Sequence, residues 1–393
     1  MACILKAPSP GSKGVVVFTT PERDLVIFKD KALRLSLEHL KARWALGLHH
    51  NWHDYQLKYD PIFDFHMAGE DDLKEITGKH IPLIPMDACN FSPRCFAPAA
   101  GEKFWDILYV ARAVYFKRIP EFFRLIRTLY DQGKRYRVLL ICPVPPLENG
   151  NKGAFCNVRE EYDKLFSEDE KDLFTLLTID FRYPFPLDLE TLSHFYKSSK
   201  VFVHTADDER RCRVTGYAWA TGMPVVGMPC IASLLPKQLR KEPFLFEVTH
   251  YEEFADATVK ALESAGKQYD FTEVRNVVSQ DYTQKNLSQY LCIYAGRNDS
   301  GNDFNLEGLD IRLGRHHGIS IGKNKIYQSL VSFSKYLNER PGELVSIDLS
   351  RSDPEIYISG IEKFNGNGCI VPKNNCLTRI RDVLQSIAKI VIK

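Results

Sequence analysis

The sequence lacks any long uninterrupted apolar run. None reaches the about 18 to 20 residues that a membrane-spanning helix needs. The opening residues, MACILKAPSPGSKG, have too short an apolar part for a signal peptide and contain proline and glycine. We therefore expect a protein that stays in the cytoplasm.

An excess of charge of one sign is also missing. The chain has 52 basic and 50 acidic residues, which gives a formal net charge of +2. There is no bulk electrostatic field to attract nucleic acid, so we expect no nucleic-acid partner. Any recognition of an anion must be local.

The ten cysteines include no Cys-x-x-Cys pair and no companion histidines at zinc-finger spacing. We expect no metal and no cofactor. For a cytoplasmic protein the cysteines are interpreted as reduced thiols, and the closest pairs, Cys89 with Cys95 and Cys369 with Cys376, as incidental.

The chain does contain enough apolar sequence for two core-bearing domains, with 393 residues and 44% hydrophobic content. Between about 100 and 265, short apolar runs alternate with helical patterns. The expected strands are 106–110, 137–142, 176–180, 200–204, 223–227 and 244–248, and the clearest helices are 120–133, 189–199 and 251–262. This alternation predicts a parallel, doubly wound, Rossmann-like sheet whose ligand lies outside the carboxyl ends of the strands.

The two ends of the chain are less regular. Before residue 100 we expect strands at 14–18, 24–28 and 81–85 and a helix at 31–46. After 266 we expect a linker at 297–305, strands at 309–313, 343–349 and 355–359, a helix at 325–337 and an amphipathic last helix near 377–390. The predicted domains are 1–100, 101–265 and 266–393, with the last segment crossing back onto the first domain.

One stretch, 207–226, reads DDERRCRVTGYAWATGMPVV and places three acidic residues before a helix of small residues. In one interpretation Asp207, Asp208 and Glu209 only complement the positive end of the helix dipole. In the other they belong to a ligand site at the carboxyl end of the strand at 200–204.

The whole string resembles the C-terminal domain of retaining GT-B glycosyltransferases, which carry Glu, seven residues, Glu-Ala-x-Ala-x-Gly-x-Pro-Val-Val. Glu209 stands at the first Glu, and the remainder is matched by Ala218, Ala220, Gly222, Pro224, Val225 and Val226. The resemblance implies that Glu209 faces the donor sugar. Tyr217 replaces the second Glu, which usually holds the ribose hydroxyls, and Gly216 lies beside it in the implied donor site.

Upstream, DILYVARAVYFKRIPEFFRLI resembles the opening of the same domain, where a strand runs into Gly-Arg-x4-Lys-Gly. Arg112 and Lys117 match the two cations, while Ala111 and Arg118 replace the glycines. Two fixed cations can neutralise the charge that develops on a departing diphosphate, so no metal is required. The alternative is a solvated pair of surface cations.

Family members often place a histidine near the donor sugar, and LHHNWHDY offers His49, His50 and His53. We select His50 as the candidate, although packing and helix capping are the alternative roles for such a cluster. The last helix, with Arg379, Arg381, Lys389 and Lys393, either docks on a domain or contacts an anionic membrane surface.

The resemblance implies an α/β protein of the GT-B fold, with two Rossmann-like domains that face a cleft, and a C-terminal extension. It implies a retaining, metal-independent glycosyltransferase that takes a UDP- or GDP-sugar and a glycan, lipid-linked or other hydroxyl acceptor. The first alternative is a GT-B-fold binding or scaffolding protein without catalysis. The second is another nucleotide-sugar enzyme, such as an epimerase.

Overall fold

A computed structural model describes residues 3–19, 30–50, 60–69, 82–86, 88–144, 157–180, 187–209, 211–267, 269–296, 303–306, 308–309, 313 and 337. The chain divides into two compact units, each treated by itself below. Unit 1 groups the described residues of Met1–His49, Asp60–Phe65 and Leu291–Lys393, and unit 2 those of His50–Tyr59 and His66–Tyr290. The domain boundaries expected from the sequence stay a prediction.

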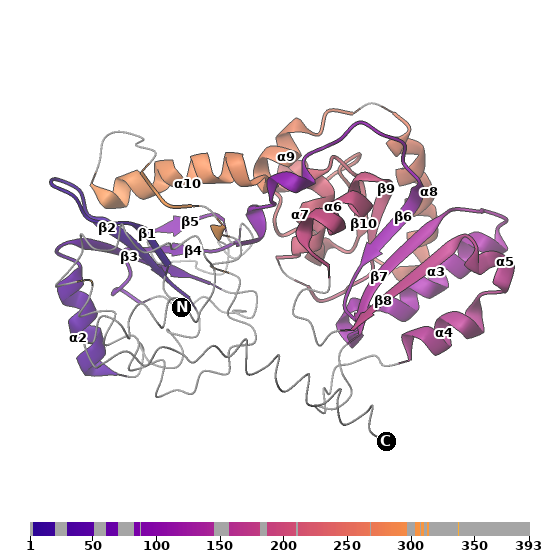
Figure 1. Cartoon of the computed structure of the whole chain (residues 1–393), viewed down its shortest axis with the longest axis horizontal. Coiled ribbons are helices and arrows are strands. Elements are labelled where there is room, and N and C mark those ends of the chain that lie inside the picture. Colours follow the sequence, from indigo (N-terminus) through magenta and orange to yellow (C-terminus); the bar gives the residue numbers. More distant parts are fainter. Residues whose placement is uncertain are drawn as a thin grey trace, which may run out of the picture. The chain divides into compact units, whose positions relative to one another are not determined.

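Unit 2 contains a six-stranded parallel sheet (Figure 1). Its strands are β6 (Trp105–Val110), β7 (Val138–Val144), β8 (Phe174–Asp180), β9 (Ser199–His204), β10 (Val225–Gly227) and β11 (Leu245–Glu247). The spatial order is β11-β10-β9-β6-β7-β8, which is the Rossmann order when the strands are numbered within the sheet. All six expected strands are present, and the predicted α/β class with parallel sheets is confirmed.

Helices cover both faces of this sheet. They are α3 (Ile119–Asp131), α4 (Val158–Leu165), α5 (Glu168–Lys171), α6 (Leu189–Lys197), α7 (Arg213–Ala220), α8 (Phe254–Ala265) and α9 (Thr272–Val278). Helix α8 packs on β9, β10 and α3, whereas α7 packs with α6 and α9 against the other face (Figure 1). Strands buried on both faces need continuous apolar runs, and the sequence supplies them at VLLIC and VFV.

The expected helix at 120–133 is α3, and its sequence explains both its face and its end. Phe122, Phe123 and Ile126 are buried in the core. Gly133 has a φ of +76°, and its backbone N–H donates to the carbonyl of Tyr130. A glycine in this left-handed conformation ends a helix without the steric cost of a Cβ, as the sequence predicted.

A second sheet contains β1 (Cys3–Lys6), β2 (Gly14–Phe18), β3 (Trp44–His49), β4 (Phe65–Met67) and β5 (Leu83–Ile84), in that order. Strand β1 is antiparallel to β2, and the β2–β3 and β4–β5 pairs are parallel. The prediction of a helix over 31–46 is wrong at its C-terminal end. Helix α2 (Lys31–Leu40) ends at Leu40, and strand β3 begins at Trp44. Every residue of β3 is buried, and periodicity cannot separate such a short apolar run from a helix.

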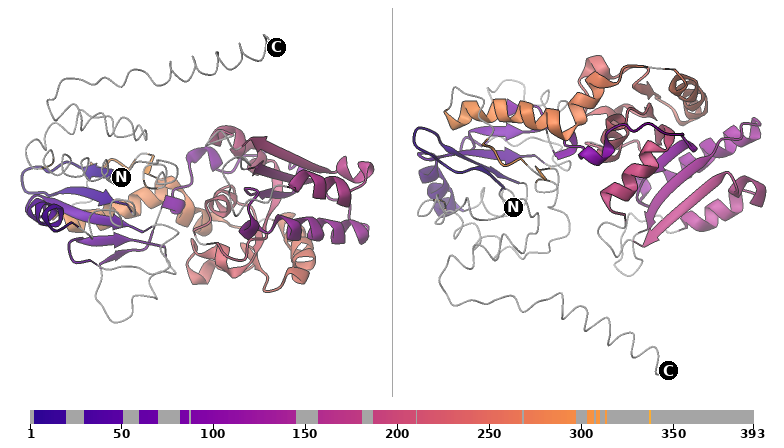
Figure 2. Two further views of the ribbon diagram at one scale, coloured as in Figure 1. Left: turned by 90° about the horizontal axis from the view of Figure 1, so that it is seen from below. Right: turned by 45° about the horizontal axis from the view of Figure 1, so that its top comes forward.

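The end of α10 (Gln280–Ala295) lies beside the second sheet in both views of Figure 2. The backbone N–H of Lys13 donates to the carbonyl of Ala295 at 2.9 Å, and Lys6 forms an ion pair of 2.7 Å with Asp303. The prediction of a strand at 309–313 is wrong at the two residues of this range that the structure describes. Leu309 and Leu313 are helical and buried, which fits their spacing of four residues.

Other expectations fall outside the described residues: the strand at 24–28, His53, residues 297–302 of the linker, and nearly all of the chain after 313. Among the helices that are described, none has the length and apolar character to cross a bilayer. The cytoplasmic location stays a prediction.

Candidate functional site

The site is built where β6 and β9 lie side by side at the centre of the unit 2 sheet. In the Rossmann order the chain direction across the sheet reverses between these two strands, and ligands bind outside their carboxyl ends. Lys117 follows β6 in the short 3-10 helix η5 (Tyr115–Lys117), and Glu209 follows β9. The two motifs found in the sequence therefore meet at the reversal point of the sheet.

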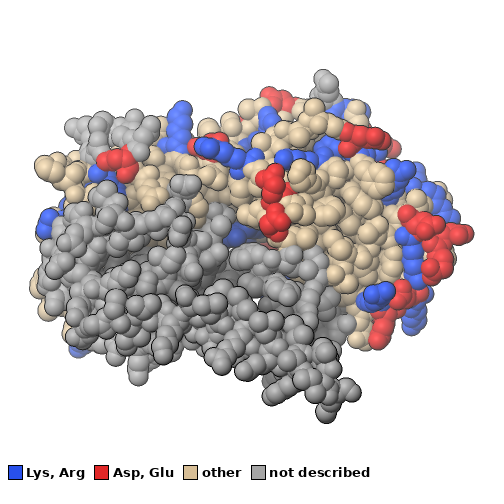
Figure 3. All heavy atoms as spheres, in the orientation of Figure 1, with Lys and Arg blue, Asp and Glu red and all other residues tan. Residues whose placement is uncertain are grey.

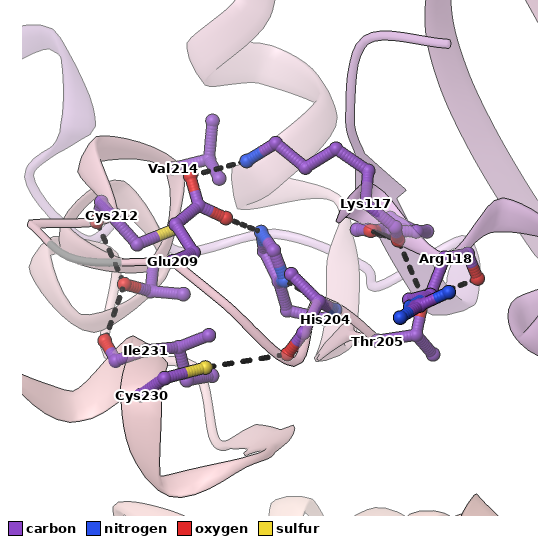
Figure 4. A network of polar contacts seen from close by, with 12 residues as sticks. Lys117, Arg118, His204, Thr205, Glu209, Cys212, Val214, Cys230 and Ile231 are labelled. Atoms are coloured by element: carbon purple, nitrogen blue, oxygen red, sulfur yellow. Dashed lines mark hydrogen bonds and ion pairs between the residues drawn. The ribbon is translucent and has the colours of Figure 1, made fainter. Parts of the chain in front are cut away.

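Lys117 and Glu209 contact each other directly, Nζ to Oε1 (Figure 4). The Lys117 side chain is 8% exposed and that of Glu209 is 15% exposed. Burial by itself would raise the pKa of the Glu209 carboxyl, but the positive charge of Lys117 and the contact with His204 outweigh burial and hold the pKa well below its usual value. Glu209 is therefore a carboxylate throughout the physiological pH range.

His204, the last residue of β9, holds the other oxygen of Glu209. Its Nε2 lies 2.8 Å from Glu209 Oε2 (Figure 4). The backbone N–H of Ala206 donates to His204 Nδ1 at 3.2 Å, so Nδ1 is an acceptor and the ring proton resides on Nε2. Burial lowers the pKa of His204, although Glu209 opposes that shift. The imidazole is therefore neutral, and its protonated Nε2 lies close to the carboxylate.

The backbone that carries Lys117 is fixed from two sides. The Tyr109 hydroxyl donates to the Lys117 carbonyl, and Thr205 Oγ1 reaches the same carbonyl at 3.1 Å and that of Arg118 at 3.0 Å. Tyr109 comes from β6 and Thr205 from the end of β9. The two strands thus determine the position of the Lys117 main chain.

Arg118 stands where the family motif has its second glycine, and its φ of 52° lies in the left-handed region. This is a backbone conformation that glycine adopts without steric cost and that other residues rarely adopt. Its guanidinium pairs with Asp207 at 2.6 Å. The acidic cluster does not complement a helix end: α7 begins at Arg213 and has no acidic residue in its first turn.

Arg112, the other predicted cation, lies in the loop directly after β6 and is exposed. The loss of water around its guanidinium lowers its pKa, and the negative charge of Glu209 acts in the opposite direction. Arg112 is thus close enough to Glu209 for the two charges to interact. A role of Arg112 toward a donor diphosphate stays a prediction.

His50 is buried and is connected to the segment after Glu209. Its carbonyl accepts a hydrogen bond from Arg211 Nη1, and its Nε2 lies 2.7 Å from His66 Nδ1. The two imidazoles are stacked, with centroids 5.0 Å apart. Arg211 itself is buried and has a φ of 54°. A role of His50 toward the donor sugar stays a prediction.

Tyr217 and Gly216 lie on α7 in surroundings of a different kind. The Tyr217 ring is 4% exposed and stacks on Phe96 with centroids 4.1 Å apart. A Cβ at Gly216 would meet the Cys89 carbonyl and Leu234, each at 3.3 Å. Tyr217 and Gly216 are therefore packed as core residues are. The predicted contact of Tyr217 and Gly216 with the donor stays a prediction.

His204, Glu209 and Cys212 bring three potential metal-ligand atoms within 4.8 Å of one another. Their chemistry does not suit a metal ion. His204 Nε2 carries the ring proton, burial raises the pKa of the Cys212 thiol, and Lys117 already neutralises the carboxylate.

No family model matches the sequence. No curated protein matches it either. The solved structures it resembles include TarM, with 13% sequence identity over 71% of this chain and 54% of TarM and a TM-score of 0.47. Another is the GtfA/B complex, with 12% identity over 66% of this chain and 55% of the matched chain and a TM-score of 0.45. A further one is a sucrose-phosphate synthase from Thermosynechococcus elongatus, with 16% identity over 64% of this chain and 69% of the synthase and a TM-score of 0.44. The chain spans about half the length of the first two.

Two residues of the site were not selected from the sequence. His204 ends the run VFVH and looks like a core histidine, and Arg211 lies among other charged residues. Only the adjacency of β6 and β9 would have drawn attention to His204. Elsewhere, acidic and basic side chains are intermingled on the surface of unit 2 (Figure 3), in pairs such as Arg124 with Glu121.

Proposed function

We propose that the chain is a glycosyltransferase that moves a sugar from a nucleotide-diphosphate donor to a hydroxyl group of a glycan or lipid-linked acceptor. One observation carries the proposal. Lys117 and Glu209, taken from two motifs about a hundred residues apart in the sequence, are in contact at the reversal point of a Rossmann sheet. In this proposal residues 101–265 form the donor domain and 1–100 the acceptor side, which face a cleft that excludes water.

The chemistry follows from the charges. Breaking the bond between the anomeric carbon and the diphosphate leaves negative charge on the leaving group. Lys117 and Arg112 stabilise that charge, which makes a metal unnecessary. Glu209, fixed as a carboxylate, accepts hydrogen bonds from sugar hydroxyls and orients the sugar. Retention of configuration, a UDP- or GDP-sugar donor and a role for His50 near the sugar follow from the family resemblance alone.

The test is a donor panel with a matched pair of variants. The purified chain is incubated with UDP-, GDP-, ADP- and CMP-sugars, and thermal shift and nucleotide release are recorded. We expect one nucleotide to stabilise the protein and to be released, and Lys117→Ala to abolish release. Lys134→Ala removes an exposed lysine after α3 and serves as the control. Release that is equal in both variants would refute the assignment of Lys117.

A binding or scaffolding protein without catalysis is the second candidate. It is supported by the self-neutralised Lys117–Glu209 pair and by the packing of Tyr217, which stands where the family has a second carboxylate. A nucleotide-sugar that stabilises the protein without any turnover would favour this candidate over the enzyme.

A further inference from the structure

Lys117 has to serve two partners if the proposed reaction is correct. In the structure its ammonium group contacts Glu209, and in the reaction it must turn to the donor diphosphate. The Glu209 side chain is only 15% exposed, so little water can replace the lost cation. A largely buried charge that loses its partner is strongly destabilised. Some other group must hold the carboxylate while Lys117 is engaged.

His204 is placed to do this. Its side chain is fully buried, and its ring packs edge-on against Tyr109 with centroids 5.2 Å apart. The Ala206 N–H occupies Nδ1, which leaves the ring proton on Nε2, and Nε2 lies 2.8 Å from Glu209 Oε2. This oxygen is not the one that Lys117 contacts, because Lys117 binds Oε1. The two contacts are therefore independent, and one can open while the other stays closed.

We propose that His204 is a positioning residue: its Nε2–H keeps the Glu209 carboxylate in place when Lys117 moves to the donor phosphates. The role rests on the proposed glycosyl transfer. His204 acts through Glu209 and has no direct contact with the reacting atoms in this scheme. Because the ring is neutral, it holds the carboxylate without adding a second positive charge that would compete for the phosphates.

The kinetic test compares three variants with UDP-glucose, GDP-mannose and ADP-glucose as probes. His204→Leu removes the donor and keeps an apolar side chain, His204→Gln restores an N–H near the Nε2 position, and His194→Leu alters an exposed histidine on α6. We expect His204→Leu to lower kcat about tenfold to a hundredfold, because that is the usual effect of losing a hydrogen bond to a charged group. The donor KM should change less. His204→Gln should recover most of the loss. A kcat for His204→Leu equal to that of His194→Leu, or no recovery by glutamine, would overturn the proposal.

A second measurement does not depend on activity. Nitrogen-15 spectra of the histidine rings in the wild-type chain should show His204 as the Nε2–H tautomer, with a signal that moves in Glu209→Gln. The Nδ1–H tautomer would overturn the inference, even if the enzyme is active. If the wild type has no turnover with any donor, the proposed function fails and the positioning role fails with it. The expected tautomer would then identify the contact as structural.

Discussion

Among the described residues of unit 2, the carboxylates of Glu170 and Glu209 are both largely shielded from water and paired with a cation, and the two pairs are built differently. Glu170 receives two hydrogen bonds of 2.6 Å from the guanidinium of Arg127, and it also accepts the Ser167 N–H in a capping box. Glu209 has a single lysine ammonium on Oε1, and the imidazole Nε2 of His204 lies 2.8 Å from Oε2. The first pair joins α3 to α5, whereas the second lies at the reversal point of the sheet.

The difference teaches how to separate a structural ion pair from a functional one. The planar guanidinium of Arg127 grips both oxygens of Glu170, and it also donates to Asp131 and to the Leu165 carbonyl, so the pair is rigid and its donors are engaged within the fold. A lysine is a point charge on a flexible stem, and it can leave one anion for another. We therefore expect substitution at Glu170 to affect stability alone, and substitution at Lys117 to affect both stability and activity.

The largest expected effect is that of Lys117→Met. Turnover should fall about 10²- to 10³-fold, the range measured when one stabilising donor is removed from an active site. Stability should fall by about 3 to 5 kcal/mol, because Glu209 remains buried without its cation. Steady-state kinetics and urea unfolding measure the two quantities. The double variant Lys117→Met/Glu209→Gln should regain most of the stability and none of the activity; regained activity would contradict the proposed role of Lys117.

The sequence predicted the sheet, and it placed each of the two motifs after a strand, for a physical reason. Parallel strands that are buried on both faces have continuous apolar sequences, and their carboxyl ends lie along the same edge of the sheet. It did not predict a role for His204. The position of His204 beside Glu209 depends on the return of the chain toward β6, and its tautomer depends on the Ala206 N–H. The change from glycine to Arg118 looked like a departure from the motif, yet the backbone there adopts a left-handed conformation.

Tyr217 provides the next largest effect and tests whether α7 belongs to the site or to the core. Its stacked, buried ring predicts that Tyr217→Ala lowers the free energy of unfolding by about 3 to 5 kcal/mol. Tyr217→Phe keeps the ring, so we expect nucleotide affinity to stay unchanged in calorimetric titration. Weaker nucleotide binding by the phenylalanine variant would instead support the ribose contact that the resemblance implies.

The Glu170 pair predicts a pH effect of intermediate size. Hydrogen bonds from Arg127 lower the pKa of the Glu170 carboxyl from 4.5 to about 2. Because the folded-state pKa is depressed, the pair stabilises the protein above pH 4.5, and that stabilisation is lost as the pH falls toward 2. Its size is about 1 to 3 kcal/mol. The stability difference between wild type and Glu170→Gln, followed by urea unfolding, should shrink over this window. A difference that does not vary with pH would show that Arg127 does not bind the carboxylate selectively.

The smallest effect is expected for Arg118→Gly, which restores the residue of the family motif. Three contributions compete. Glycine removes about 1 to 2 kcal/mol of strain from the left-handed backbone, but the more flexible unfolded chain costs about 0.5 to 1 kcal/mol. The half-exposed pair with Asp207 contributes only about 0 to 1 kcal/mol. The free energy of unfolding should therefore change by no more than about 1.5 kcal/mol in either direction. A much larger loss would show that the Arg118–Asp207 pair helps to hold the Lys117 backbone, and would place it with the functional network that contains Lys117, Glu209 and His204.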